Sequence, residues 1–254
     1  MMQTEVQYPW KEFFGEAYLQ FSPHILHDER TKEEIKGIKQ LLALDNPSTI
    51  LDLGCGHGRI SIPLAQEGHE VIGLDGSEVS LAQAKRLSHE LGIENIEWVL
   101  SEMKNMELPL DSLDYVLNMS TAIGYVSEDE DRQAFERVYK RLKPGGKLLI
   151  DTENRDYKIK NYIPRLWDQM ANQPVWSSRY FDCITGRWVE ETMWYQDSVM
   201  EKATLDIRLY TATELTSMLK SCGFAISSVF GDLKGASLTI DSPRMIILAE
   251  KGGY

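Results

Sequence analysis

Ile50-Leu-Asp-Leu-Gly-Cys-Gly-His-Gly58, followed by a helical run from Arg59 to Glu67, is the segment around which the rest of the chain is arranged. An apolar strand there runs into three glycines at alternate positions and then directly into a helix. Glycine has no Cβ, so the loop can adopt positive φ and a ligand can approach its backbone closely. The free N–H groups of the following helix point toward the loop. The pattern predicts a nucleoside-like ligand that is held by main-chain atoms.

The spacing of these glycines separates two kinds of nucleoside site. A dinucleotide fingerprint has the form G-x-G-x-x-G, which would need glycine at position 59, where this chain has Arg59. The apolar segment that starts at Glu70 ends in Asp75, whose carboxylate can accept hydrogen bonds from both ribose hydroxyls of a nucleoside. Dinucleotide sites also hold the ribose with such a carboxylate, so Asp75 alone does not distinguish the two kinds of site. The glycine spacing therefore argues against an NAD-dependent oxidoreductase.

Composition and charge exclude several classes of protein. The chain has 254 residues, 43% of them hydrophobic, which permits one large domain with an elaboration. It contains neither an apolar run long enough to span a membrane nor the basic and apolar regions of a signal peptide. Three scattered cysteines without metal-ligand spacing favour the reduced cytoplasm and predict no metal site. A formal net charge of −12 disfavours nucleic acid and membrane surfaces as partners.

The order of the expected elements divides the chain into four parts. Residues 1–45 form a helical cap, with an aromatic amphipathic stretch that ends near Pro23 and a second helix that begins at the capping box Thr31-x-x-Glu34. Residues 46–153 alternate strands and helices, which predicts a parallel sheet with helices on both faces. The strands are expected at 49–53, 70–74, 96–100, 113–119 and 147–151, with helices at 59–66, at 77–91 and after the capping box at Ser127.

The alternation of strands and helices stops after the fifth strand. Residues 154–208 contain four of the six tryptophans, and the segment Trp188–Trp194 alternates at period two, which predicts an antiparallel insert with a hairpin turn at Asp182–Gly186. Residues 209–254 supply a helix that starts at a capping box, Thr211-x-x-Glu214, and two strands that complete the sheet. The insert has two open interpretations: a substrate wall and lid, or a satellite core or dimer surface.

With Asp52 on the strand, the glycine loop reads D-x-G-x-G-x-G and resembles the first motif of the class I methyltransferases that use S-adenosyl-L-methionine (SAM). Leu113-Asp-Tyr-Val116 and Leu142-Lys-Pro-Gly-Gly-Lys-Leu-Leu149 resemble further marks of this family. Three later motifs resemble a bacterial group of small-molecule methyltransferases: Arg208-Leu-Tyr-Thr211, Gly231-Asp-Leu-Lys-Gly235 and Ser242-Pro-Arg244. The resemblance spans residues 28–153 and, in short motifs, 209–250.

This resemblance implies both a fold and a cofactor. The fold is α/β: a Rossmann-like seven-stranded methyltransferase sheet, mostly parallel with one antiparallel strand, with N-terminal helices and an antiparallel β insert after the fifth strand. The cofactor is SAM, and its product is S-adenosyl-L-homocysteine (SAH). The backbone of Gly54, Cys55 and Gly56 would contact the methionine part of SAM. Asp52 would bind its ammonium group or, alternatively, cap the N–H groups of the loop, while Asp75 would hold the ribose.

The resemblance also assigns the adenine end of the site. Gly76 and Ser77 would line the adenine. Glu102, between Ser101 and Met103, takes the place of an Asp that meets the adenine amino group in such enzymes, although it can also be read as a solvated loop carboxylate. Four residues at the C-terminal end of the fourth strand would face the sulfonium and the acceptor: Asn118, Met119, Ser120 and Thr121.

The N-terminal part would close over the carboxylate of SAM through Tyr18 and Arg30. Arg30 has an equally good interpretation as a surface ion pair, because an arginine in the first turn of a helix commonly makes one.

Methyl transfer from a sulfonium is an in-line displacement, so alignment and dehydration dominate. Near-attack geometry is worth about 7–11 kcal/mol, more than the roughly 3–5 kcal/mol that a general base supplies. A strongly marked catalytic residue is therefore not required. The candidate bases are Tyr125, Glu153 and Glu190. The candidate acceptor-binding residues are Thr121, Tyr125, Asn154, Tyr157, Trp188 and Trp194.

Together these observations predict a cytoplasmic SAM-dependent methyltransferase that acts on a nitrogen or oxygen of a small molecule, as a monomer or homodimer. Two alternatives stay open. The acceptor could be a macromolecule such as tRNA or protein, or the chain could bind SAM as a regulator without catalysis.

Overall fold

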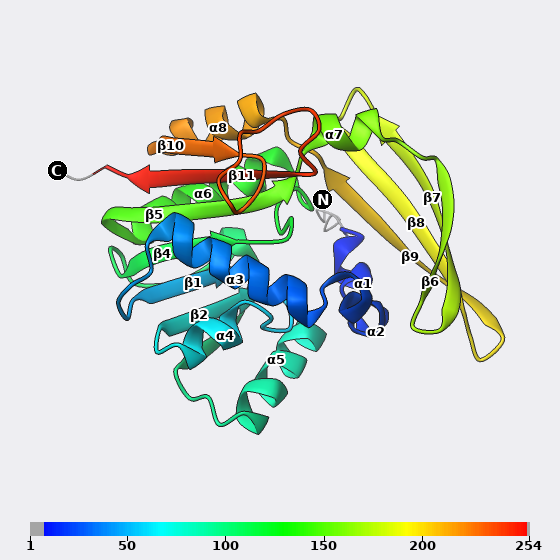
Figure 1. Cartoon of the computed structure of the whole chain (residues 1–254), viewed down its shortest axis with the longest axis horizontal. Helices are drawn as coiled ribbons and strands as arrows, with labels where there is room; N and C mark the ends of the chain where they lie inside the picture. The colour runs from blue at the N-terminus through cyan, green and yellow to red at the C-terminus, as the bar shows by residue number, and fades with distance from the viewer. Residues whose placement is uncertain (1–7, 253–254) are drawn as a thin grey trace, which may run out of the picture.

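The computed structural model describes residues 8–252, which form two β-sheets with helices between and around them (Figure 1). The larger sheet has seven strands, in the order β10 (Phe224–Phe230), β11 (Arg244–Lys251), β5 (Leu142–Glu153), β4 (Leu113–Asn118), β1 (Thr49–Leu53), β2 (Glu70–Asp75) and β3 (Ile96–Leu100). The smaller sheet has four strands, in the order β6 (Arg165–Met170), β7 (Gln173–Asp182), β8 (Arg187–Gln196) and β9 (Val199–Arg208).

The larger sheet has the topology that the sequence predicts. Strand β1 pairs in parallel with β2 and β4, and β11 runs antiparallel to both of its neighbours, β5 and β10. One strand is therefore reversed in an otherwise parallel sheet. The fifth strand begins earlier than expected, at Leu142 rather than Lys147, because Leu142 already pairs with Leu113 of β4.

Helices cover both faces of this sheet: α3 (Asp28–Leu42) and α4 (Ser61–Gln66) on one face, α6 (Glu128–Arg141) and α8 (Ala212–Ser221) on the other. Successive strand residues point to opposite faces. Ile50 therefore packs in one buried cluster with Leu64 of α4, while Leu51 packs in a second cluster with Phe135 of α6. A core on each side of the sheet holds the strand ends in a fixed arrangement.

Three helix starts are predicted from capping boxes, and two of these boxes are present. Ser127 and Thr211 each accept a hydrogen bond from the backbone of the third helical residue, whose glutamate side chain accepts one in return. The expected capping box at Thr31 is wrong. Helix α3 begins one turn earlier, where Nδ1 of His27 accepts the hydrogen bond from the backbone N–H of Arg30.

The aromatic N-terminal stretch forms two short helices, α1 (Trp10–Phe13) and α2 (Glu16–Ile25), separated by Gly15. The stretch ends near Pro23, as expected: α2 includes Pro23 and ends at Ile25. Both helices lie between the two sheets (Figure 1). None of the helices within residues 8–252 is long and apolar enough to cross a membrane.

The smaller sheet is an antiparallel meander that follows β5 and the short helix α7 (Arg155–Lys160). The predicted hairpin is present: Phe181 pairs with Trp188 across a turn in which Asp182 accepts hydrogen bonds from the backbone of Ile184 and Thr185. Trp188 is only 2% exposed on the inner face, whereas Trp167 on the outer face is 70% exposed.

Helix α2 docks against the inner face of the smaller sheet. The rings of Phe21 and Trp194 meet edge to face, with centroids 5.3 Å apart, and Val175 completes the cluster. The backbone N–H of Ala171 also donates to Nε2 of His24, at 2.7 Å. The smaller sheet thus braces the helices that cover the carboxyl ends of the core strands.

We expect the double variant Phe21→Ala, Trp194→Ala to lose about 0.5–1.5 kcal/mol less stability than the sum of the two single losses, the usual value of an aromatic pair, because each single variant already loses the contact. Urea unfolding of both single variants and the double variant measures this coupling. The control pair is Phe21→Ala with Leu219→Ala of α8, which should add within about 0.5 kcal/mol. Additivity in the first cycle would show that the ring contact does not hold α2 to the sheet.

Candidate functional site

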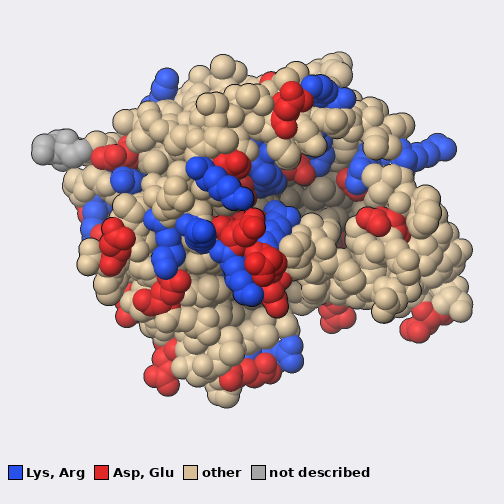
Figure 2. Space-filling model, in the orientation of Figure 1, with Lys and Arg blue, Asp and Glu red and all other residues tan. Residues whose placement is uncertain are grey.

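A cavity of about 1100 Å³, partly open to solvent, lies at the carboxyl ends of the core strands, where open α/β sheets bind ligands. Its floor comes from the segments that follow β1, β2, β3 and β4, and its roof comes from Trp10, Phe14 and Tyr18. The molecular surface is hollowed between the core and the smaller sheet, beside a group of charged side chains over α3 (Figure 2).

The glycine loop has the conformation that the sequence predicts. Gly54, Gly56 and Gly58 have φ of 84°, 54° and 82°. A Cβ at Gly54 would lie 2.6 Å from that of Ala122, so only glycine fits there. At Gly56, by contrast, a Cβ would meet nothing within 4 Å, and the residue lines the cavity. The backbone of the loop is therefore open to a ligand.

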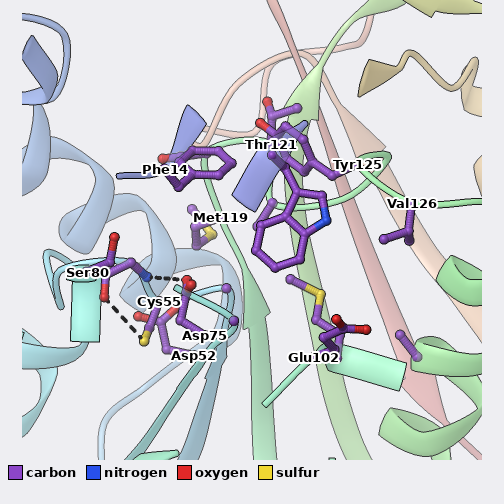
Figure 3. Close-up of a pocket in the computed structure, with 18 of the residues that line it drawn as sticks. Phe14, Asp52, Cys55, Asp75, Ser80, Glu102, Met119, Thr121, Tyr125 and Val126 are labelled. Carbon is purple, nitrogen blue, oxygen red and sulfur yellow. Dashed lines mark hydrogen bonds between the residues drawn. The ribbon is translucent and has the colours of Figure 1, made fainter. Parts of the chain in front are cut away.

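Asp75 joins the loop to the second strand. Its two carboxylate oxygens accept hydrogen bonds from the backbone N–H groups of Gly56 and Ser77, each at 2.8 Å. Burial raises the pKa of Asp75, and these backbone donors oppose the increase. Each oxygen keeps a further lone pair, so the carboxylate can accept two hydroxyls as well. Figure 3 shows Asp75 beside Asp52 and Cys55 at one end of the cavity.

Asp52 lines the cavity but is only 2% exposed. Its carboxylate accepts a hydrogen bond from the Ser61 hydroxyl at 2.6 Å, while the backbone N–H groups of Gly54 and Gly56 donate to other acceptors. Burial raises the pKa of Asp52 to about 6, although Ser61 and the charge of Arg59 favour the ionised form. A cation placed in the cavity would favour that form further.

Arg59 lines the cavity. In the sequence it served only to argue against the dinucleotide glycine motif. It donates to the Ser120 hydroxyl at 2.7 Å and pairs with Glu34 at 2.5 Å. Arg30, expected at the SAM carboxylate, does not line the cavity and pairs with the other oxygen of Glu34 at 2.7 Å. Arg59 is therefore the better-placed arginine for a carboxylate, and only the three-dimensional packing reveals it.

A strained turn follows β4. Ser120 and Thr121 both adopt left-handed backbone conformations, with φ of 55° and 64°, and both line the cavity. Asp151 of β5 holds them, because its carboxylate accepts from the N–H of Ser120 at 3.1 Å and its carbonyl accepts from the N–H of Thr121 at 2.8 Å. Strain of this kind persists where the surrounding structure enforces it, commonly at functional sites.

Asn118 lies behind this turn and not in the cavity wall. It is fully buried, and its amide donates to the carbonyl of Leu53 at 2.9 Å. Met119, the next residue, does line the cavity. Asn118 therefore ties β4 to β1 beneath the position at which a sulfonium is expected.

An aromatic group forms the other end of the cavity. Phe14 lies between Tyr18 and Tyr125, with ring centroids 4.9 Å and 5.2 Å away. Figure 3 shows Phe14, Thr121 and Tyr125 close together. Burial raises the pKa of Tyr125 far above its ordinary value. At neutral pH this side chain is therefore a neutral phenol, which can donate a hydrogen bond but cannot act as a base in that form.

Glu102 and Met103 line the cavity as expected, together with Gly76. Glu102 pairs with Lys11 at 2.8 Å and with Lys104 at 3.4 Å, and the hydrogen bond from Lys11 is the main reason why its pKa is lowered. Two expected residues lie just outside the wall: Ser77, which caps α5 (Glu78–Glu90), and Ser101.

The remaining candidates are engaged away from the cavity. Glu153 pairs with Lys158, and Glu190 pairs with Arg179 at 2.7 Å. The amide of Asn154 donates to two backbone carbonyls of the loop before β11. Six candidates do not line the cavity: Glu153, Asn154, Tyr157, Trp188, Glu190 and Trp194. Ion pairs and core packing account for their place, so a direct role is not supported by this arrangement.

Comparisons with known proteins agree with this geometry. Residues 50–146 match a family model described as a methyltransferase domain. The protein YqeM of Bacillus subtilis (strain 168) is 28% identical over 253 residues, which cover 94% of this chain and 96% of YqeM.

Two solved structures share the fold. One is an S-adenosylmethionine-dependent methyltransferase from Clostridium acetobutylicum ATCC 824, with a TM-score of 0.79 at 17% identity over 96% of this chain and 99% of that one. The other is SAM-bound CalS10 from Micromonospora echinaspora, with a TM-score of 0.68 at 18% identity over 93% and 97%. Together with the family model over residues 50–146, these likenesses support a class I SAM-dependent methyltransferase.

The residues present fit the cofactor of this class. The backbone at Gly56 is open, Asp75 has free acceptor capacity, and Asp52 is a buried carboxylate that a cation would stabilise. Within residues 8–252 no group of three or more His, Cys, Asp and Glu side chains could hold a metal ion.

We expect SAH to bind more weakly as the pH falls below about 6, because its ammonium group pairs with ionised Asp52, whose pKa in the free protein is about 6. For one proton the affinity falls by at most about tenfold per pH unit. Calorimetry from about pH 5 to pH 8 measures the effect. Asp52→Asn should bind more weakly and lose this dependence. A wild-type affinity that is constant with pH would contradict the role of Asp52.

Proposed function

We propose that this methyltransferase transfers the methyl group of SAM to a nitrogen or oxygen of a small molecule by in-line displacement. The observation that carries the proposal is one cavity with two chemically different ends. The end at Asp52 and Asp75 suits a zwitterionic nucleoside, and the aromatic end at Phe14, Tyr18 and Tyr125 suits a small acceptor. CalS10, which shares the fold, is described as an amino pentose methyltransferase, and this supports a small acceptor.

The cofactor supplies an electrophilic methyl carbon on a sulfonium. The chain positions the two reactants and excludes water from them. The rings of Phe14 and Tyr18 exclude water from the acceptor end, which strengthens every polar contact there. The neutral hydroxyl of Tyr125 donates a hydrogen bond that orients the acceptor, and the turn at Ser120 and Thr121 fixes the distance between acceptor and methyl.

The reaction is tested with purified protein and SAM labelled at the methyl carbon. Against a panel of small amines and hydroxyl compounds, we expect labelled product and an equal amount of SAH from at least one chemical class. Turnover on tRNA or protein, but on no small molecule, would favour a macromolecular acceptor instead. Tight SAM binding with no methyl release from any acceptor would indicate a regulator.

We expect Asp75→Ala to weaken SAH binding by about 100-fold or more, because a charged acceptor for two hydroxyls is lost. Glu70→Ala at the exposed start of the same strand is the matched control and should bind as the wild type does. Calorimetry with SAH and with NAD checks both variants, and NAD should give no heat of binding. Wild-type affinity in Asp75→Ala would overturn the map of the site.

For Tyr125→Phe we expect kcat/KM for the acceptor to fall by about 2- to 15-fold, the value of one neutral hydrogen bond, with no change in the Kd of SAH. Tyr180→Phe is the control, because Tyr180 is 57% exposed on the smaller sheet. A changed Kd for SAH with unchanged acceptor kinetics would place Tyr125 at the cofactor instead.

A further inference from the structure

Trp10 forms part of the roof of the cavity, next to Gly76. Its side chain is 9% exposed, and its Nε1 is buried without a hydrogen-bond partner among residues 8–252. A Cβ built on Gly76 would lie 2.6 Å from the six-membered ring of this indole. The ring therefore rests on the backbone of Gly76, a place that a side chain at position 76 would fill.

This location follows directly after Asp75, which we assign to the ribose. In a nucleoside the base is bonded to the ribose, so the base has to lie beside the residues next to the sugar. On this side of Asp75 the cavity is bounded by Gly76, Trp10 and Glu102. Trp10 is the one flat aromatic surface among these three. Glycine at 76 makes room for that surface.

We propose that Trp10 is an adenine-binding residue: its indole stacks on the adenine ring of SAM and supplies the wall that Gly76 cannot. This inference rests on the proposed site at Asp75. Stacking of a base on an aromatic side chain is worth about 5- to 150-fold in affinity.

Lys11 positions Trp10. Its ammonium lies 5.5 Å from the centroid of the Trp10 ring and pairs with Glu102 at 2.8 Å. The other end of α1 is held by the Ser77 hydroxyl, which donates to the carbonyl of Phe14 at 2.8 Å. A helix of four residues is not stable by itself. These tertiary contacts, and the bound base, hold α1 in place over the adenine.

Trp10 is a wall of the base site and not its occupant. With the indole in place, Gly76, Glu102 and Met103 still line the cavity. An indole that filled the base site would have to leave before the cofactor could bind, so its removal would strengthen binding. If the indole is a wall, its removal should weaken cofactor binding. The direction of the change in affinity therefore distinguishes a wall from an occupant.

The test measures the Kd of SAH and of 5′-methylthioadenosine, which keeps the adenosine but lacks the amino acid, by calorimetry. Trp10→Ala should weaken both ligands by the same factor, about 5- to 150-fold. Trp10→Phe should recover most of the loss, and Lys11→Met should lose less than Trp10→Ala. Trp167→Ala, at a tryptophan that is 70% exposed, is the control and should bind normally.

A second measurement does not depend on Trp10→Ala being folded. The difference in fluorescence between wild type and Trp10→Phe reports Trp10 alone, and SAH should quench it at saturation. The proposal is overturned if Trp10→Ala binds SAH as tightly as the wild type or more tightly. It is also overturned if the fluorescence of Trp10 does not change when SAH binds. A wild type that binds SAH while these effects are absent refutes this proposal alone. A wild type that binds no SAH refutes the proposed function as well.

Discussion

The hydrogen bonds from Gly56 and Ser77 to Asp75 are the constraint on which the site depends. They tie the loop after β1 to the start of α5 after β2, so one carboxylate sets the positions of two ligand-facing segments. Burial alone would favour the protonated acid, and the two backbone donors oppose this. The group that we assign to the ribose therefore also shapes the loop around it. Asp75 therefore serves both ligand binding and the geometry of the loop.

Local signals in the sequence were sufficient for most of the fold. The apolar run of β1 and the capping boxes at Ser127 and Thr211 each lie within a few residues, so they could be recognised without tertiary information. The start of α3 was misplaced for the same reason. A pattern typical of a capping box occurs at Thr31, inside the helix, whereas the true N-cap is His27, a residue outside the preferred set.

The site could be predicted only where topology fixes it. Asp52 is the last residue but one of β1, and Asp75 ends the adjacent parallel strand β2, so both lie near the same edge in any sheet with this order. Arg59 and Trp10 reach the cavity through packing between distant segments, and no local pattern marks them. In the aromatic insert, by contrast, residues that the sequence suggested for the pocket lie in a core. Trp188 and Trp194 look the same in sequence whether they line a pocket or form a core, and here the core accounts for them.

The two ends of the cavity are built by different parts of the chain. Apart from Trp10 of α1, the cofactor end comes from the carboxyl ends of the core strands, where the sheet leaves little freedom. The aromatic end depends on α1 and α2, which the smaller sheet braces through Phe21 and Trp194 and which Lys11 ties to the core through Glu102. Changes in the smaller sheet can therefore reshape the acceptor pocket through these helices while the glycine loop stays intact. This separation allows one cofactor site to serve different acceptors.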